Sequence, residues 1–569
     1  MDGRFDFIGL EIHSSRMWQL EQVNRTIDFM ADHGFNALIF HQSDLMNTLV
    51  LPEKYVTVKT MWEKFSALRY FAVENNQHYL NLVARRAKKR GIGLYLNVKE
   101  IFYPDDIAEL YPQLIRDNAV ACPSDPFWFG YLEACFEELC ERVPDLEGVI
   151  LSAGTHESRT SITRQNPCTC ERCRNLDGAE WYRRLFESIY RPLARRQKKL
   201  VVRDFTFTRK GQSVLLRAAE AVPSDVAVSL KNTPHDYYPT FPNNPRIGTT
   251  GHTEYVEFDT WGQFFGGGFF PVSIAEDIEK RIRYCRERGV SGVLCRTDWE
   301  GMYENSTFNS TNMINLYAFG LLANHPGADL DIAYREWGQA GWIDALTPGS
   351  GLPLPVKPAD PGAWVRMKDF VKASWQVMRK TVYVRDHWFC EDNMFPDSLD
   401  KAFKMMVTVH GRDDWEPGAS RRLDPTVDEN LEFIMREKQE AVREAENLRD
   451  ILKPEACGFP AETIRRIDET LDLYRWYAQI GLHSAGVVFL TRRACMTGAP
   501  GDERKARSAV AGLRYFRENL EERLGLGEDI YPHIVYWLLN TGRMDRLADD
   551  AERLLGELRG KGLYETTGL

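Results

Sequence analysis

Short apolar runs alternate with longer amphipathic segments over roughly the first half of the chain. The runs predict strands at residues 6–12, 37–40, 93–98, 148–152, 200–202, 226–230, 255–259 and 292–295. Between most of these runs, apolar residues recur at helical spacing, as in residues 18–33, 79–90, 127–142, 181–196 and 274–288. About eight strands alternating with helices imply a parallel sheet, and eight such strands imply closure into a (β/α)8 barrel.

The pattern changes near Leu330. Strand patterns nearly vanish, and long helical patterns follow at residues 364–383, 427–452, 461–491, 504–523 and 544–558. A Pro/Gly-rich segment at residues 347–362 is typical of a seam between domains. We therefore expect an α/β fold in which a TIM barrel, residues 1–330, precedes an all-α domain, residues 331–569.

Composition narrows the class of function. The chain of 569 residues has a net charge of −10, which argues against a nucleic-acid or anionic-membrane partner. No apolar run approaches the roughly 18 residues of a membrane span. The N-terminus lacks a basic region followed by an apolar one, so we expect no signal peptide and a cytoplasmic protein. A signal already removed from the chain would leave the same sequence.

Carboxylates follow three of the predicted strands, at the end of a barrel where chemistry takes place. Glu157 lies just beyond the fourth strand, where a general acid is expected if its surroundings favour the protonated form. Asp236 and Glu257, on the sixth and seventh strands, are candidate partners across the mouth. Glu254 and Asp259 are rivals for Glu257, and Asp259 is the stronger because it lies on the same strand face. This set predicts hydrolysis of a glycosidic bond, which needs an acid and a base or nucleophile.

Cations accompany these carboxylates. Arg203 and Lys231 end the fifth and sixth strands, and together they can bind a substrate that carries its own carboxylate. The alternative is that they are counter-ions of the site carboxylates. We also expect Asn232, Trp261 and Arg296 to bind substrate, since they follow or end strands of the same region.

The order of these residues resembles glycoside hydrolase family 67, the inverting α-glucuronidases. The shared elements are a strand followed by Glu157, a strand ending in Arg203, the segment Lys231-Asn-x-Pro-x-Asp236, and Glu257-Phe before a glycine-rich turn. The resemblance implies that Glu157 is the catalytic acid, that Asp236 and Glu257 are candidate bases, and that Arg203 and Lys231 bind the uronate. It also implies no cofactor, and a dimer formed through the helical domain.

Three other functions remain open at this point. A β-N-acetylhexosaminidase-like barrel uses an adjacent Asp-Glu pair, whereas His156 precedes Glu157 here. A non-catalytic sugar-binding barrel would have lost a carboxylate, and none is plainly missing. A metal-dependent hydrolase is disfavoured because paired histidines at strand ends are lacking.

Three of the eleven cysteines, Cys168, Cys170 and Cys173, are clustered. Such spacing resembles part of a zinc site, but structural zinc usually has four ligands and no second cysteine pair is near. His156 or a distant cysteine would have to complete the site. The alternatives are reduced thiols in a loop or a disulfide, and we predict no metal.

Overall fold

The computed structural model describes residues 3–56, 67–116, 120–164, 167–301, 305–346, 353–409, 411–526, 528 and 530–560. Eight parallel strands form a closed barrel in sequence order, and β8 pairs with β1 to close it. The strands are β1 (Phe7–Ile12), β2 (Ala37–His41), β3 (Gly93–Lys99), β4 (Leu146–Ala153), β5 (Lys199–Asp204), β6 (Ala227–Lys231), β7 (Glu254–Asp259) and β8 (Gly292–Arg296). The TIM barrel predicted from the sequence is confirmed.

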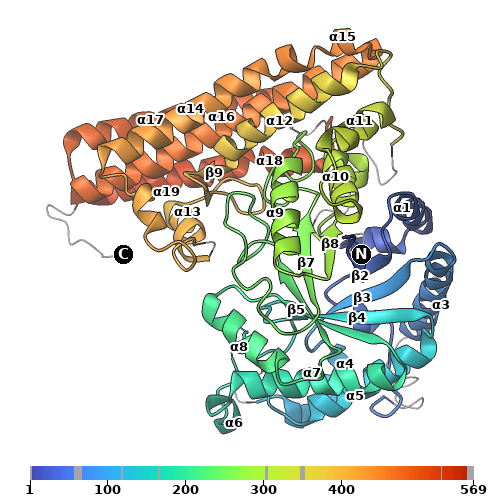
Figure 1. Cartoon of the computed structure of the whole chain (residues 1–569). Coiled ribbons are helices and arrows are strands. Elements are labelled where there is room, and N and C mark those ends of the chain that lie inside the picture. Colours follow the sequence, from blue (N-terminus) through green and yellow to red (C-terminus); the bar gives the residue numbers. More distant parts are fainter. Residues whose placement is uncertain are drawn as a thin grey trace.

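Helices cover the outside of the barrel (Figure 1). They are α1 (Leu20–Asp32), α3 (Ala67–Lys89), α4 (Asp105–Leu110), α5 (Phe127–Arg142), α6 (Glu171–Arg174), α7 (Gly178–Arg195), α8 (Arg209–Ala219), α9 (Ala275–Glu287) and α10 (Met313–Asn324). The described residues 232–253, between β6 and β7, form a loop without a helix. Part of the helical domain packs there instead, since Arg412 donates a hydrogen bond to the Thr240 carbonyl.

The interior of the barrel is built in two layers. The layer nearer the N-terminal ends of the strands is apolar and consists of Phe7, Ala37, Ile39, Tyr95, Ile150, Val201, Ala227, Tyr255 and Leu294. Two residues farther along seven of these strands, the inward positions are polar: His41, Asn97, Ser152, Arg203, Ser229, Glu257 and Arg296. Strands β2, β3, β5, β6 and β8 therefore run past the apolar segments that predicted them, because their last inward side chains face the polar mouth.

The C-terminal region is helical, as predicted. Its main helices are α11 (Leu330–Ala340), α12 (Ala363–Val382), α14 (Asp428–Leu452), α16 (Ala461–Thr497), α17 (Pro500–Leu524), α18 (His533–Leu538) and α19 (Thr541–Gly560). The longest of them lie side by side in a bundle next to the α10–α11 side of the barrel (Figure 1). No helix among the described residues is long and apolar enough to cross a membrane. The domain division at residue 330 and the dimer stay predictions, and the expected seam falls partly outside the described residues.

The helical domain docks on the glycine-rich turn after β7. Asn393, which follows the short hairpin β9 (Tyr383–Val384) and β10 (His387–Trp388), accepts a hydrogen bond from the Gly266 amide at 2.9 Å. Its side-chain amide also donates to the Gln263 carbonyl at 2.8 Å. Gly268 has a φ of +66°, and a Cβ atom there would lie 2.3 Å from Nε1 of Trp261. The turn therefore needs glycine both for its backbone conformation and for its contact with Trp261.

Candidate active site

A chain of hydrogen bonds joins the inward polar side chains at the mouth of the barrel. Asn97 donates to Glu11 at 2.9 Å, and Ser152 donates to Asn97 at 2.8 Å. Arg203 Nη1 donates to Ser152 at 3.0 Å, and its Nε donates to Glu257 at 2.8 Å. All five side chains are buried. Since a buried polar group is costly unless it is hydrogen-bonded, this network fixes the orientation of the catalytic candidates.

Glu257 is the most completely bound of the predicted carboxylates. Ser229 donates to its Oε1 at 2.6 Å and Tyr237 donates to its Oε2 at 2.7 Å, in addition to the Arg203 ion pair. The guanidinium of Arg203 also reaches Ser152 and Tyr237. The structure therefore places Arg203 as the counter-ion of Glu257, the alternative that the sequence left open.

Asp236 forms a second ion pair. Lys231 Nζ lies 2.5 Å from its Oδ1, and the Asp236 side chain is 14% exposed, against 3% for Glu257. Asp236 has a φ of +51°, a left-handed conformation that is unusual for residues other than glycine. Burial lowers the pKa of Lys231, and the neighbouring Asp236 partly offsets this. Of the two base candidates, Asp236 is the one that solvent can reach.

Glu157 lies beyond the end of β4 and forms a third ion pair, with Lys99 of β3. Its side chain is 39% exposed, whereas that of Lys99 is fully buried. The loop that carries Glu157 is held by Glu100, which accepts a hydrogen bond from the Gly154 amide at 2.6 Å. Burial raises the pKa of Glu100 to about 7. Glu100 is 1% exposed, so it positions the loop and does not face the mouth.

One aromatic ring brings the three ion pairs together. The Phe205 ring centroid lies 4.7 Å from Lys99 Nζ, 4.6 Å from Arg203 Cζ and 4.0 Å from Lys231 Nζ. The ring follows directly on β5 and is partly exposed. Glu157, Asp236 and Glu257, each paired with one of these cations, are thus grouped around Phe205, a residue that no local sequence pattern distinguishes.

The two rivals of Glu257 have other roles. Asp259 accepts hydrogen bonds from the amides of Trp261, Gly262 and Gln263, and so shapes the turn after β7. Glu254 accepts from the Gly248 and Thr250 amides at the opposite end of the same strand. Both carboxylates therefore accept hydrogen bonds from backbone amides, and Asp259 also pairs with the Arg296 side chain.

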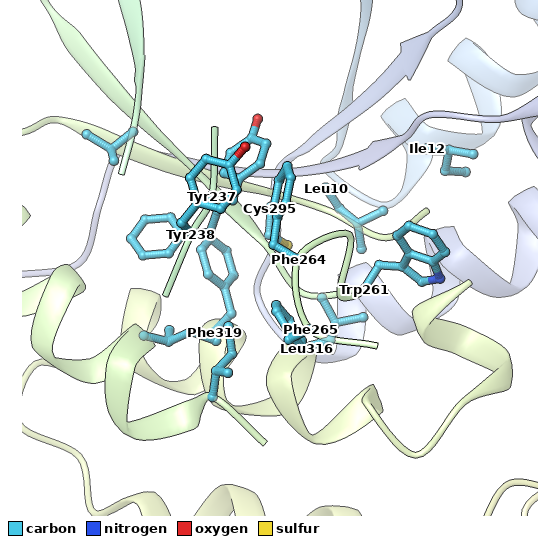
Figure 2. Close-up of a cluster of buried hydrophobic side chains, with 14 of the residues drawn as sticks. Leu10, Ile12, Tyr237, Tyr238, Trp261, Phe264, Phe265, Cys295, Leu316 and Phe319 are labelled. Carbon is cyan, nitrogen blue, oxygen red and sulfur yellow. The ribbon is translucent and has the colours of Figure 1, made fainter. Parts of the chain in front are cut away.

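The remaining predicted binding residues differ in accessibility. Trp261 is 1% exposed and belongs to one cluster of buried side chains with Leu10, Phe264 and Phe265 (Figure 2). Asn232 is buried beside Lys231, and its Oδ1 has no hydrogen-bond partner among the described residues. Arg296 pairs with Asp259 at 3.3 Å and lies over the Tyr237 ring.

A pair of histidines lies at the mouth, so the expectation that paired histidines at strand ends are lacking is wrong. The rings of His13 and His41 stack 3.7 Å apart, His41 lies 3.1 Å from Glu11, and His13 lies 3.6 Å from Glu300. Burial, followed by the charges of His13 and Lys99, lowers the pKa of His41 well below its ordinary value. Glu11, His13 and His41 could hold a metal by proximity, but stacked rings direct their nitrogens along parallel planes rather than toward one ion. His13 follows the first predicted strand and His41 follows the second, and this placement is the sequence feature that indicates them as site residues.

Asp392 reaches the mouth from the helical domain. It lies beside Gln263, whose Nε2 approaches its Oδ1 at 3.4 Å, and Trp537 donates to its carbonyl at 3.0 Å. Burial raises the pKa of Asp392 to about 6, and Asp236 adds to this effect. Nothing in the local sequence connects Asp392 with the barrel.

Comparisons with known proteins identify the fold. No protein-family model matches this chain, and no curated protein matches it. Among solved structures, an enzyme of glycoside hydrolase family 138, described as targeting pectin rhamnogalacturonan II, aligns with a TM-score of 0.60 at 12% identity. The alignment covers 98% of this chain and 66% of that one, so this chain spans slightly less than two thirds of that enzyme's length. At such low identity the likeness establishes a shared fold.

Two further matches are weaker. An O-GlcNAc hydrolase of Thermobaculum terrenum aligns with a TM-score of 0.43 at 10% identity, covering 98% of this chain and 97% of that one. A GH20 exo-β-N-acetylglucosaminidase of Vibrio harveyi aligns with a TM-score of 0.39 at 13% identity, covering 58% and 56%. All three of these solved structures are glycoside hydrolases by their descriptions. The last two, with TM-scores below 0.5, add nothing to the fold assignment.

Proposed function

We propose that this protein is a glycoside hydrolase that removes a uronic-acid residue from a glycan with inversion of configuration. The observation that carries the proposal is the grouping of three carboxylate–cation pairs around the partly exposed Phe205 ring. An apolar ring face suits the C–H face of a sugar, and two carboxylates on opposite sides of the scissile bond suit its hydrolysis. The resemblance to the α-glucuronidases supports the same class of substrate.

Glu157 is the general acid in this proposal because it is the most exposed of the three carboxylates. It gives its proton to the leaving oxygen while a water attacks the anomeric carbon from the other face. Asp236 accepts the proton of that water, since Glu257 is saturated with donors and buried. Glu257, held by Arg203, orients Tyr237 next to Asp236.

The substrate carboxylate has a specific task here. In the absence of substrate, Lys99 is paired with Glu157. A uronate bound beside Phe205 offers Lys99 and Lys231 another anion. Glu157 is then released from its ion pair with Lys99 and can approach the leaving oxygen, so a neutral sugar should be cleaved poorly.

The test is a substrate panel for the purified full-length chain. Aryl uronides and uronic-acid-capped oligosaccharides, pectic fragments included, are compared with neutral hexosides and N-acetylhexosaminides. We expect uronides to be hydrolysed at least ~10²-fold faster than the matching neutral hexosides. Preference for N-acetylhexosaminides would establish the hexosaminidase alternative. Glycan binding without hydrolysis of any member would establish the sugar-binding barrel instead.

A further inference from the structure

Four cysteines gather on the side of the barrel away from the helical bundle. Cys168, Cys170 and Cys173 lie in the segment between β4 and α7, where Cys170 is the N-cap of the short helix α6 and Cys173 lies within it. Cys122 lies shortly before α5. Figure 1 shows α5, α6 and α7 together at the end of the molecule opposite the bundle. Cys122 is the fourth ligand candidate, and because it is distant in sequence, the spacing of the other three cysteines does not indicate it.

The four sulfur atoms are mutual neighbours. Cys122 Sγ lies 3.6 Å from both Cys170 Sγ and Cys173 Sγ, and all four Sγ atoms lie within 4.8 Å of one another. A tetrahedral ion with Zn–S bonds of about 2.3 Å holds its sulfurs roughly 3.8 Å apart. The spacing of the thiols therefore matches that of a four-cysteine zinc site. A disulfide would join only two of them and leave no reason for the other two to converge.

The backbone around Cys122 is fixed by two buried tryptophans. Trp128 Nε1 donates to the Cys122 carbonyl at 2.9 Å, and Trp181 Nε1 donates to the Pro123 carbonyl at 2.8 Å. Both indoles are at most 1% exposed. Trp128 belongs to α5 and Trp181 to α7, so the helices that flank the two cysteine segments hold Cys122 toward the other three thiols.

Cationic groups are available to balance the charge of such a site. Four thiolates around Zn²⁺ carry a net charge of −2, and a positive neighbour lowers the cost of burying it. Arg116 interacts with Cys122 and Cys170, and its Nη2 also lies 3.1 Å from Asp125. Arg172, which lies between Cys170 and Cys173 in the sequence, reaches the same Asp125 at 3.6 Å.

We propose that Cys122, Cys168, Cys170 and Cys173 form a structural zinc site. Binding converts four thiols and one Zn²⁺ into a tetrathiolate complex and releases four protons, with no change of oxidation state. With four protein ligands the site leaves no open position, so its role is structural rather than catalytic. The ion ties the segment that follows β4 to the segment that precedes α5.

Metal content tests the proposal independently of any activity. The full-length chain, purified under reducing conditions without chelator, should contain about one zinc per chain by elemental analysis. An organomercurial should release the ion in proportion to the thiols it blocks, as measured with a chromogenic chelator. Cobalt exchanged into the site should show the visible absorption of tetrahedral thiolate ligation. These wild-type measurements do not depend on the folding of any variant.

Substitutions then assign the ligands. Cys173→Ser and Cys122→Ser should lower the zinc content at least fivefold and reduce the melting temperature, whereas Cys495→Ser, in α16 and outside the cluster, should retain both. Absence of zinc from the wild-type chain, even after refolding with zinc and reductant, would overturn the proposal. Zinc that survives both ligand substitutions would overturn it equally, since the ion would then be bound elsewhere.

Discussion

Replacing Glu100 by Gln should make the protein more stable at neutral and alkaline pH. Burial raises the pKa of Glu100 to about 7, so the folded chain holds this proton more tightly than the unfolded chain does. Its contribution to stability is therefore fully present at low pH and is lost as the pH rises toward 7 and above. The difference between this pKa and that of a solvated glutamate corresponds to about 3 kcal/mol of unfolding free energy, most of which is lost between pH 5 and pH 8.

Glutamine is neutral at every pH and can still accept the hydrogen bond from the Gly154 amide. The measurement is the free energy of the unfolding transition of the barrel in urea, for wild type and Glu100→Gln, at several pH values from 5 to 8. Between pH 5 and pH 8, the free energy of unfolding of the variant should rise by about 2–3 kcal/mol relative to that of the wild type. Glu220→Gln, at an exposed position on the barrel surface, is the matched control and should give a constant difference. A constant difference for Glu100→Gln as well would refute the reasoning.

Four further predictions concern the site and the interface between barrel and helices. Glu157→Gln should lower turnover of substrates with a sugar leaving group by about 10² or more and spare activated aryl leaving groups; equal loss on both kinds contradicts the acid role. Lys231→Met should reduce the preference for a uronide over the matching neutral hexoside by about 10–100-fold in kcat/KM, and an unchanged preference argues against uronate binding. NMR of the first-formed sugar should show the inverted anomer, because the acid and base carboxyls are expected to lie roughly 6.5–9.5 Å apart; a retained anomer would overturn the mechanism but not the fold. Gly268→Ala should lower the melting temperature by more than Gly289→Ala, since both glycines have positive φ but only the first would bring a Cβ against Trp261; equal effects would show that backbone strain alone is responsible.

The strands were predictable because they are buried on both faces. Successive residues of a barrel strand point alternately toward the barrel centre and toward the surrounding helices. Because both environments are apolar, the strand appears in the sequence as a short continuous apolar run. Their polar ends were readable for a related reason. In a closed parallel barrel the carboxyl ends of all strands meet at one mouth, so that Glu157, Asp236 and Glu257 are brought together by topology alone.

The roles within that mouth were not predictable in the same way. From the sequence, Arg203 was expected to bind a substrate carboxylate. In the structure its guanidinium donates hydrogen bonds to Glu257, Ser152 and Tyr237. Trp261 was expected to bind substrate, but the turn of three glycines that follows allows close packing over it and buries the ring. These outcomes depend on contacts between side chains from different strands, for which no local pattern exists.

The sequence by itself determined the architecture: eight strands in a barrel, a helical region after it, and a mouth lined with carboxylates and cations. Those features follow from periodicity and from the order of short segments, both of which are local. Only the tertiary structure decided which cation neutralises which carboxylate, that Asp392 joins the mouth from the helical domain, and that Cys122 meets three cysteines far along the chain. The physical reason is that ion pairing and metal ligation act over a few ångströms in space, and residues distant in sequence reach that range only after the chain has closed into its barrel.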